Sequence, residues 1–436
     1  MPIPASSLVV VATALVVGGV LLFYRPLAGS STWRAMVTPL ASIMGSGFLV
    51  CAPLLYANIG NWAVWAMAGL LVLAYGVGAV IRFNIRYGEP LFERHPACAG
   101  DRCEHRLHAA HAAGAQRVGW HDAASVLEKL SHIALAGAYC VSVSYYLQLL
   151  AGFGLHYFAA QSPWVGKVLV TAILAGIGVT GALRGLSGIE RVERVVVGLN
   201  LAMIAALVAG LVLYNATALA RGTWSLAALP VAGDAPRILR LVMGMLIVVQ
   251  GFETSRFLGS EHPAGERIRT MRLAQLVSAG IYVVFLGLMA VVVGHGGAVA
   301  DTSITAIVGY SAIVAPVLPL LLTLTAVGSQ FSASTADDAG CSGLLEAILR
   351  GRIPAKYNYL LVSAASICLT WLTDVYQIIS QASRAFALFY FLQCLVALFV
   401  LYSGKAAVAR RGMRAALFAA LALVCLGVTL FGIPAG

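Results

Sequence analysis

Long apolar stretches dominate this chain, and they constrain its fold more than any other feature. A helix that spans a lipid bilayer needs about 20 apolar residues. Of the 436 residues, 60% are hydrophobic and only 10% are charged, which is too few charges for a soluble domain. We therefore predict an all-α integral membrane protein with twelve transmembrane helices, at 7–24, 36–58, 62–83, 124–153, 164–183, 192–214, 238–258, 273–293, 316–346, 357–372, 378–402 and 415–433. Residues 303–314 are predicted to form a separate short helix outside the membrane.

The basic residues predict how these helices are oriented. The net charge is +11, with 28 Lys and Arg. If the loop at 25–34 is cytoplasmic, 23 of the Lys and Arg residues lie in or beside cytoplasmic segments. The exceptions are Lys167, Arg221, Arg237 and Arg240, which lie outside, and Arg384, which lies within a span. This positive-inside bias predicts a multi-pass protein of the inner (plasma) membrane with both termini outside. It favours the lipid bilayer, and not nucleic acid, as the partner of the basic surface.

Two predicted spans are interrupted by glycine and polar residues. The first interruption, at 41–48, reads Ala-Ser-Ile-Met-Gly-Ser-Gly-Phe, and the second, at 249–256, reads Val-Gln-Gly-Phe-Glu-Thr-Ser-Arg. Unwound backbone at membrane depth is tolerated only where it is buried in protein or lines a cavity. Close helix packing would explain one Gly-Ser-Gly segment alone. A pair of interruptions at matching places in two halves instead indicates a transporter site.

The two halves define the predicted domains. Residues 36–215 hold five spans and residues 236–403 hold five more, each set opening with an interrupted helix. Because five is odd, the second set enters the membrane from the opposite side, which makes a 5+5 inverted repeat. Residues 1–35 add one helix and a loop before the core, 216–235 form an external linker, and 404–436 add one helix after the core.

At these residues the chain resembles the amino acid–polyamine–organocation (APC) superfamily, whose members share the leucine-transporter (LeuT) fold. Residues 43–50, with Pro53 beyond, are similar to the first core helix of that family, and Gly251-Phe252-Glu253 to the sixth. Residues 351–354, Gly-Arg-Ile-Pro, are similar to the loop after the eighth core helix, so the resemblance covers 36–402. It implies a secondary transporter, not an enzyme, that imports a small-molecule solute by alternating access without a cofactor. An amino acid or an amine is the favoured solute, and an inorganic cation or a nucleobase is the alternative. The rival classes of protein are a membrane enzyme and a non-transporting membrane sensor.

The resemblance also implies roles for particular residues. Solute binding falls to Ile43, Gly45, Ser46, Gly47, Tyr139, Gln250, Gly251, Phe252 and Glu253. Core packing is the alternative for Tyr139, and capping the freed N–H groups of the second half-helix is the alternative for Glu253. Arg384 is a candidate outer gate, with pairing to a helix C-terminus as the alternative.

A dense polar run at 328–338 predicts an ion-coupling site. By resemblance, sodium would bind the carbonyls of Ala41 and Met44 with the hydroxyls of Ser334 and Thr335. The predicted fifth core helix, 192–214, contains no lysine to replace such an ion, which favours Na⁺ over H⁺. A proton carried by Asp337, Asp338 or Glu253 stays open, as does a solvated position for the two aspartates.

The cytoplasmic loop contains thiol and imidazole groups that suit zinc. Cys98, Cys103, His105 and His108 are the candidate ligands of a weak metal site. Their spacing matches no standard zinc module, so a solvated loop is the favoured interpretation.

Overall fold

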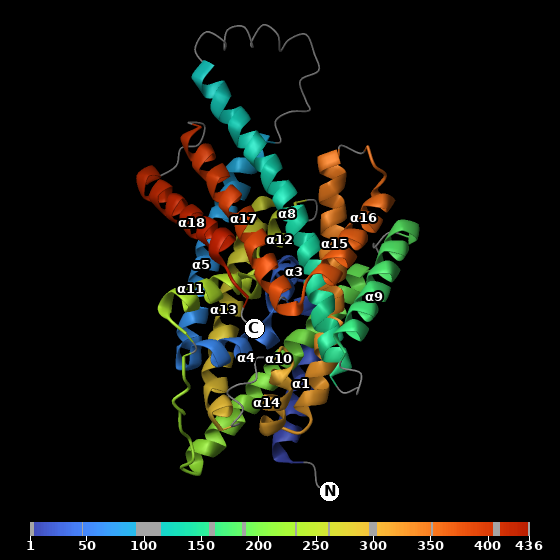
Figure 1. Ribbon diagram of the computed structural model, residues 1–436, viewed down its shortest axis with the longest axis vertical. Helices are drawn as coiled ribbons and strands as arrows, with labels where there is room; N and C mark the ends of the chain where they lie inside the picture. The colour runs from blue at the N-terminus through green and yellow to red at the C-terminus, as the bar shows by residue number, and fades with distance from the viewer. Residues whose placement is uncertain are drawn as a thin grey trace.

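The protein is described from a computed structural model (Figure 1). The structure describes residues 4–45, 47–92, 115–156, 162–184, 189–231, 233–259, 262–295, 303–349, 352–403 and 410–434. Every regular element in these ranges is helical, as predicted. Ser46 and the four candidate zinc ligands lie outside the described residues.

The helices of the first half begin with α1 (Ala5–Phe23) and end with α10. Between them lie α2 (Arg25–Ala28), α3 (Ser31–Gly45), α4 (Phe48–Ile59), the 3₁₀ turn η1 (Gly60–Trp62), α5 (Ala63–Phe83), the π-helical turn η2 (Asn84–Gly88), α6 (Glu89–Phe92), α8 (Ala115–Leu155), α9 (Pro163–Arg184) and α10 (Ile189–Ala220).

The helices of the second half begin with the broken segment that comprises α11, η3 and α12. They are α11 (Ala235–Gly244), the 3₁₀ turn η3 (Leu246–Val249), α12 (Thr254–Phe257), α13 (Ala264–His295), α14 (Ala306–Val314), α15 (Leu318–Leu349), α16 (Ala355–Leu372), α17 (Val375–Tyr402) and α18 (Arg411–Phe431). The short α14 is separate, as predicted for 303–314.

Eight runs of helix in the described residues are long and apolar enough to cross a membrane. They are Ala5–Phe23, Ser31–Phe92, Ala124–Leu155, Pro163–Leu183, Val195–Ala220, Ala264–His295, Val375–Tyr402 and Arg411–Phe431. The run Ser31–Phe92 has 62 residues and contains the α3–α4 break and α5, so it is far longer than one crossing needs. The polar α15 is not among the eight. The chain is therefore a multi-pass membrane protein.

Long helices near the middle of the molecule carry most of the packing. The long α8 packs along both α15 and α17, α9 packs on α16, and α3 packs on α13. The first and last helices lie outside this group, where α1 packs along α10 and α18 along α17. In Figure 1, α14 and the N-terminus lie at one end of the long axis and the first turns of α8 at the other. We call the end that carries Arg34 of α3 and Arg267 of α13 the basic side.

Candidate functional site

The first predicted interruption is a break between α3 and α4. The helix ends at Gly45, and α4 starts at Phe48 with Gly47 in an extended conformation. A Cβ atom added to Gly47 would lie 3.0 Å from Cγ2 and 3.1 Å from Cα of Val248. Gly47 is therefore needed for the close approach of η3.

The second predicted interruption runs from Gln250 to Glu253, between η3 and α12. Gly251 has φ +114°, where residues with a side chain are strained. A Cβ atom on Gly251 would lie 2.5 Å from Ser42 Oγ and 2.7 Å from the backbone nitrogen of Ile43. The two breaks therefore contact each other directly, although they are about 200 residues apart in sequence.

Buried side chains satisfy the backbone groups that the breaks release. The hydroxyl of Tyr282 on α13 donates to the carbonyl oxygens of Val248 (2.6 Å) and Ile43 (3.2 Å), so it bridges the two breaks. Gln330 of α15 donates to the Gly45 carbonyl at 3.0 Å. A buried backbone group without a partner costs about 1–3 kcal/mol, so these contacts stabilise the unwound segments.

Glu253 closes the second break from within. Its Oε2 atom accepts hydrogen bonds from the Gly251 backbone at 2.9 Å and from the Tyr390 hydroxyl at 2.8 Å. The Tyr390 ring stacks on Phe252, with ring centroids 5.4 Å apart. Glu253 is fully buried. These contacts lie at the break itself, and the Glu253 side chain caps no backbone N–H group of α12.

A cavity of about 340 Å³ lies beside the breaks, on their basic side. Its lining includes Thr38 before the first break and Leu258 after the second. Among the described residues that line it, Asp337 is the one charged residue. The polar residues of the lining include Ser42, Tyr139, Asn200, Ser329 and Ser332. We call this space the basic-side cavity.

Asp337 is held in place by α8. The Ser142 hydroxyl donates a hydrogen bond to Asp337 Oδ2. Ser142 is fully buried, and the exposed fraction of Asp337 is 6%. The carboxylate is therefore oriented by a neighbouring helix and presented at the cavity wall.

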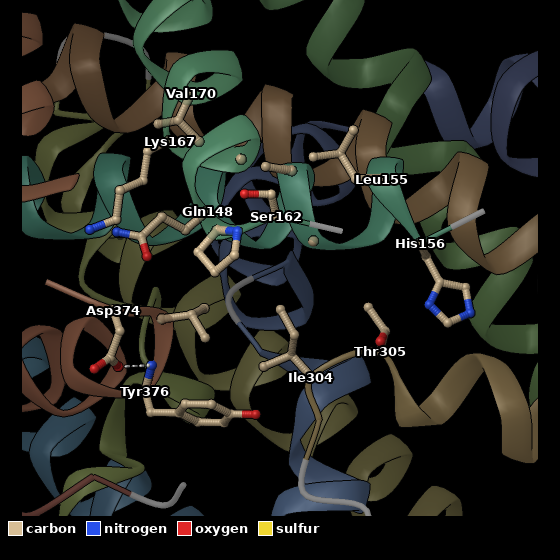
Figure 2. A pocket seen from close by; sticks show the side chains of 15 residues that line it. Gln148, Leu155, His156, Ser162, Lys167, Val170, Ile304, Thr305, Asp374 and Tyr376 are labelled. Carbon is tan, nitrogen blue, oxygen red and sulfur yellow. Dashed lines mark hydrogen bonds between the residues drawn. The ribbon is translucent and has the colours of Figure 1, made fainter. Parts of the chain in front are cut away.

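A second cavity, of about 360 Å³, lies on the opposite side of the breaks (Figure 2). Gln148 of α8, Ile304, and Tyr376 of α17 line it, and its charged residues include Lys167 and Asp374. Asp374 caps α17 by accepting from the backbone nitrogens of Tyr376 and Gln377, both at 2.9 Å. Lys167 Nζ donates to the Trp371 carbonyl at 3.2 Å. We call this space the opposite-side cavity.

A buried layer separates the two cavities. Tyr139 lines one and Gln148 lines the other, and residues 139 and 148 of α8 are about 13.5 Å apart along the helix axis at 1.5 Å per residue. Between them, the Tyr146 hydroxyl accepts from Gln250 of the second break at 2.9 Å. Both side chains are buried. The broken segment thus takes part in the barrier between the two spaces.

The predicted sodium ligands lie on two helices, Ala41 and Met44 on α3 and Ser334 and Thr335 on α15. Ser334 and Thr335 are buried, and their hydroxyls donate to the carbonyls of Phe331 (2.8 Å) and Ser332 (2.9 Å) in their own helix. Ala41 lines the basic-side cavity, whereas Met44 is buried in the core. Ser329, Gln330 and Ala333 of α15 meet the first break at Gly45.

Arg384 of α17 is exposed and its side chain contacts α18. Its Nε atom donates to the Thr429 carbonyl in the last turn of α18 at 2.7 Å. This contact with a helix C-terminus was the alternative to the gate role in the sequence analysis.

A buried ionic cluster on the basic side was not predicted from the sequence. Arg256 of α12 pairs with Glu128 of α8 at 2.5 Å and donates to Gln393 of α17. Gln393 in turn donates to Ser131 at 2.7 Å, and Asn84 donates to Gln393 at 2.8 Å. The signal was available, because ionisable residues within apolar stretches are expected to pair inside the bundle.

A second ion pair extends this cluster toward α6 and α13. Arg267 pairs with Glu89 through two hydrogen bonds of 2.7 and 3.0 Å, and it donates to the Arg256 carbonyl at 2.7 Å. The four-residue helix α12 is thus fixed to α8, α13 and α17. The cluster closes the basic side of the second broken helix.

We expect Glu128→Gln to destabilise the protein strongly. Arg256, whose side chain is 4% exposed, would lose its counter-charge. Breaking a buried ion pair by removing one partner costs about 3–5 kcal/mol. Thermal unfolding of the purified protein should move to clearly lower temperature. Glu346→Gln, the same change at an exposed residue of α15, is the control and should unfold as the parent does. Equal stability of the two variants would contradict a buried, paired Glu128.

Comparison with known proteins gives the family. A family model described as APC superfamily transporter matches residues 25–432. An uncharacterized protein of Aquifex aeolicus (strain VF5) is 35% identical over 386 residues, which are 88% of this chain and 88% of that protein.

Solved structures with a similar fold are membrane transporters. The manganese transporter of Eremococcus coleocola, in complex with an aromatic bis-isothiourea substituted compound, has a TM-score of 0.52 at 12% identity, covering 94% of this chain and 87% of that one. A mutant of that transporter has a TM-score of 0.51 at 14% identity, covering 91% and 87%. At such identity the likeness concerns the fold alone. Because the family model spans nearly the whole chain, this protein belongs to the APC superfamily transporter family.

Proposed function

We propose that this transporter moves a small amine-bearing solute, with an amino acid as the leading class, by alternating access across the inner membrane. The observation that supports this is the basic-side cavity at the paired breaks, with the Asp337 carboxylate in its wall. A carboxylate in a site of low dielectric favours a cationic partner. Neutral hydroxyl and amide groups around it suit the remaining polar atoms of such a solute.

The size of the cavity supports an organic solute. Small-molecule pockets usually measure about 300–1,000 Å³, and the basic-side cavity has about 340 Å³. The tyrosine ring of Tyr139 contributes an aromatic face, which also attracts ammonium groups. An amine with a small apolar body matches this combination of charge, volume and lining.

A divalent metal ion is the second candidate. It is favoured by the fold, because the similar solved structures are manganese transporters. Manganese prefers carboxylate, carbonyl and water ligands. Asp337 with the hydroxyls of Ser42, Ser329 and Ser332 would supply oxygen atoms of that kind.

The packing of the helices supports a 5+5 inverted repeat with twelve spans. In the first five-helix set, 36–215, α8 packs on α9, and in the second, 236–403, α15 packs on α16. Across the sets, α8 packs on α17 as α15 packs on α10. The added helices follow the same relation, since α1 packs on α10 and α18 on α17. We propose that the basic side is cytoplasmic and that both termini lie outside.

Two cavities on opposite sides of one barrier support alternating access. Rocking of the broken helices would open one cavity as it closes the other. The cluster around Arg256 would hold the basic side closed, and the Tyr146–Gln250 contact would hold the opposite side closed. Coupling to sodium or to protons would drive accumulation of the solute.

Uptake into proteoliposomes tests this proposal. We expect a mixture of labelled amino acids and putrescine to accumulate under a sodium or a proton gradient, whereas labelled Mn²⁺ should not. Accumulation of Mn²⁺ alone would favour the metal candidate. Sodium-driven uptake that is lost in Ser334→Ala/Thr335→Ala would support sodium at the predicted ligands. Uptake that ignores sodium and survives that double substitution would contradict it.

A further inference from the structure

A buried carboxylate that the solute site does not use lies one residue beyond Asp337. Asp338 has no exposed surface, and neither of its carboxylate oxygens has a hydrogen-bond partner among the described residues. It lies on the face of α15 that also carries Cys341, whose thiol is 3.8 Å from that of Cys140 on α8. An unpaired carboxylate at such a position is held as the neutral acid or binds a cation.

Further unpartnered polar atoms continue from Asp338 toward the basic side. Ser342 follows Asp338 by one helical turn on α15, so both side chains share a face. Asn358 of α16 donates to the Ser342 carbonyl at 3.2 Å. Ser342 Oγ and Asn358 Oδ1 are both buried and without a hydrogen-bond partner among the described residues. Buried groups of this kind are commonly joined by ordered water.

We infer that Asp338 is a proton-binding site, reached from the basic side along Ser342 and Asn358. This inference rests on the proposed function and makes the proton its coupling ion. Asp338 takes up one proton to become the neutral acid and returns it as the carboxylate, and no other bond changes. The hydroxyl of Ser342 both accepts and donates a hydrogen bond, which suits it to pass a proton.

The charged and titratable neighbours leave Asp338 without a counter-charge. The group of α8 that faces it is Cys140, and the one on α15 itself is Cys341. Asp337 of α15 and Tyr139 of α8, which packs on Gly340, lie at the basic-side cavity, and Glu346 of α15 is exposed. Five helices that pack against α15 carry further titratable or charged groups with described side chains. These are Glu128, Lys129, His132, Tyr145 and Tyr146 on α8, Lys356, Tyr357, Tyr359 and Cys368 on α16, Tyr214 on α10, Tyr310 on α14, and Arg34 on α3. No ion pair joins Asp338 to any described residue.

A proton on Asp338 would act on the solute site through α15. With the proton bound, the interface of α15 with α8 and α16 stays closed. Without it, an unpaired charge would have to be hydrated, which requires that interface to loosen. Asp337, on the adjacent position, is held by Ser142 of the same helix α8. Loss of the proton would therefore disturb the solute-binding carboxylate.

Infrared spectroscopy of the purified full-length protein tests the proton site directly. At neutral pH we expect the C=O stretching band of a buried, protonated carboxylic acid. The Asp338 component of this band should be lost in Asp338→Asn, an isosteric change, and retained in Asp337→Asn and in Glu253→Gln, which removes the other fully buried carboxylate of the described residues. A difference spectrum between the parent and Asp338→Asn that lacks this component at neutral and at mildly acidic pH would overturn the inference.

Exchange of that proton with solvent tests the route. After transfer to D₂O, the band should shift severalfold more slowly in Ser342→Ala than in the parent. Ser363→Ala is the matched control. Ser363 is buried like Ser342, but it lies on α16 and faces Gly178 of α9. Equal slowing in both variants, or in neither, would contradict the route along Ser342.

Coupling is tested with proteoliposomes that contain a pH indicator. An equimolar mixture of the twenty common amino acids and putrescine is added outside, and internal pH and uptake are recorded together. We expect uptake with acidification in the parent, and uptake without acidification in Asp338→Asn. Uptake without acidification in the parent would overturn the coupling role. If nothing is taken up, the proposed solute class fails, and the infrared band still decides whether Asp338 binds a proton.

Discussion

Asp337→Asn should reduce the affinity for an amine solute at least tenfold while leaving the protein folded. The change removes one charge from the wall of the basic-side cavity and keeps an oxygen that accepts from Ser142. Hydrogen bonds to charged groups contribute about 1.5–3 kcal/mol, and each 1.4 kcal/mol is a tenfold change in binding. Uptake by proteoliposomes at a series of solute concentrations measures the effect.

The control for this prediction makes the same change at another aspartate. Asp234 is exposed and caps α11 by accepting from the Arg237 backbone nitrogen at 3.2 Å. Because Asn caps a helix as well as Asp does, Asp234→Asn should neither unfold the protein nor alter uptake. If Asp337→Asn and Asp234→Asn transport equally well, the solute does not bind Asp337 and the proposed site is wrong.

Gly251→Ala should abolish transport and lower the yield of folded protein. An added methyl group would overlap Ser42 Oγ and the Ile43 backbone, and φ +114° is strained for alanine. Such backbone strain alone costs about 1–3 kcal/mol. Gly47→Val should act in the same way from the other side of the contact, because its Cβ would meet Val248. Size-exclusion profiles and proteoliposome uptake report folding and transport separately.

A glycine in open surroundings provides the control for both variants. Gly287 of α13 has nothing within 4 Å of an added Cβ atom. Within a helix, Ala is preferred over Gly by about 1 kcal/mol, so Gly287→Ala should be neutral or slightly stabilising. Normal transport by Gly251→Ala would mean that the two breaks do not need their close contact.

Much of the architecture could be predicted from local sequence. The apolar stretches led to the helices, because a backbone inside a bilayer has to satisfy its own hydrogen bonds. Both predicted interruptions, 41–48 and 249–256, contain a break in the structure, between Gly45 and Phe48 in the first and from Gln250 to Glu253 in the second, since glycine and polar residues leave the helix least stable there. The family resemblance rested on these same residues, and the family is confirmed.

The partners of the polar residues could not be predicted in the same way. Ser334 and Thr335 lie within the polar run at 328–338, yet their hydroxyls bond to their own helix, and Ser329 and Gln330 of the same run meet the first break instead. A rotation of α15 by a fraction of a turn decides which of these two pairs of residues faces the first break. The hydrophobic pattern cannot predict this rotation, because α15 carries polar groups on several faces. The sodium ligands stay a prediction.

The sequence by itself determined that this chain is helical, crosses the membrane many times and breaks two helices, because these properties depend on residues close together along the chain. Only the tertiary structure decided that Gly251 touches Ser42, that Arg256 pairs with Glu128, and that Asp337 and Asp338 face different surroundings. These contacts join residues far apart in sequence. Their geometry follows from how whole helices pack, so burial and pairing are properties of the assembled bundle.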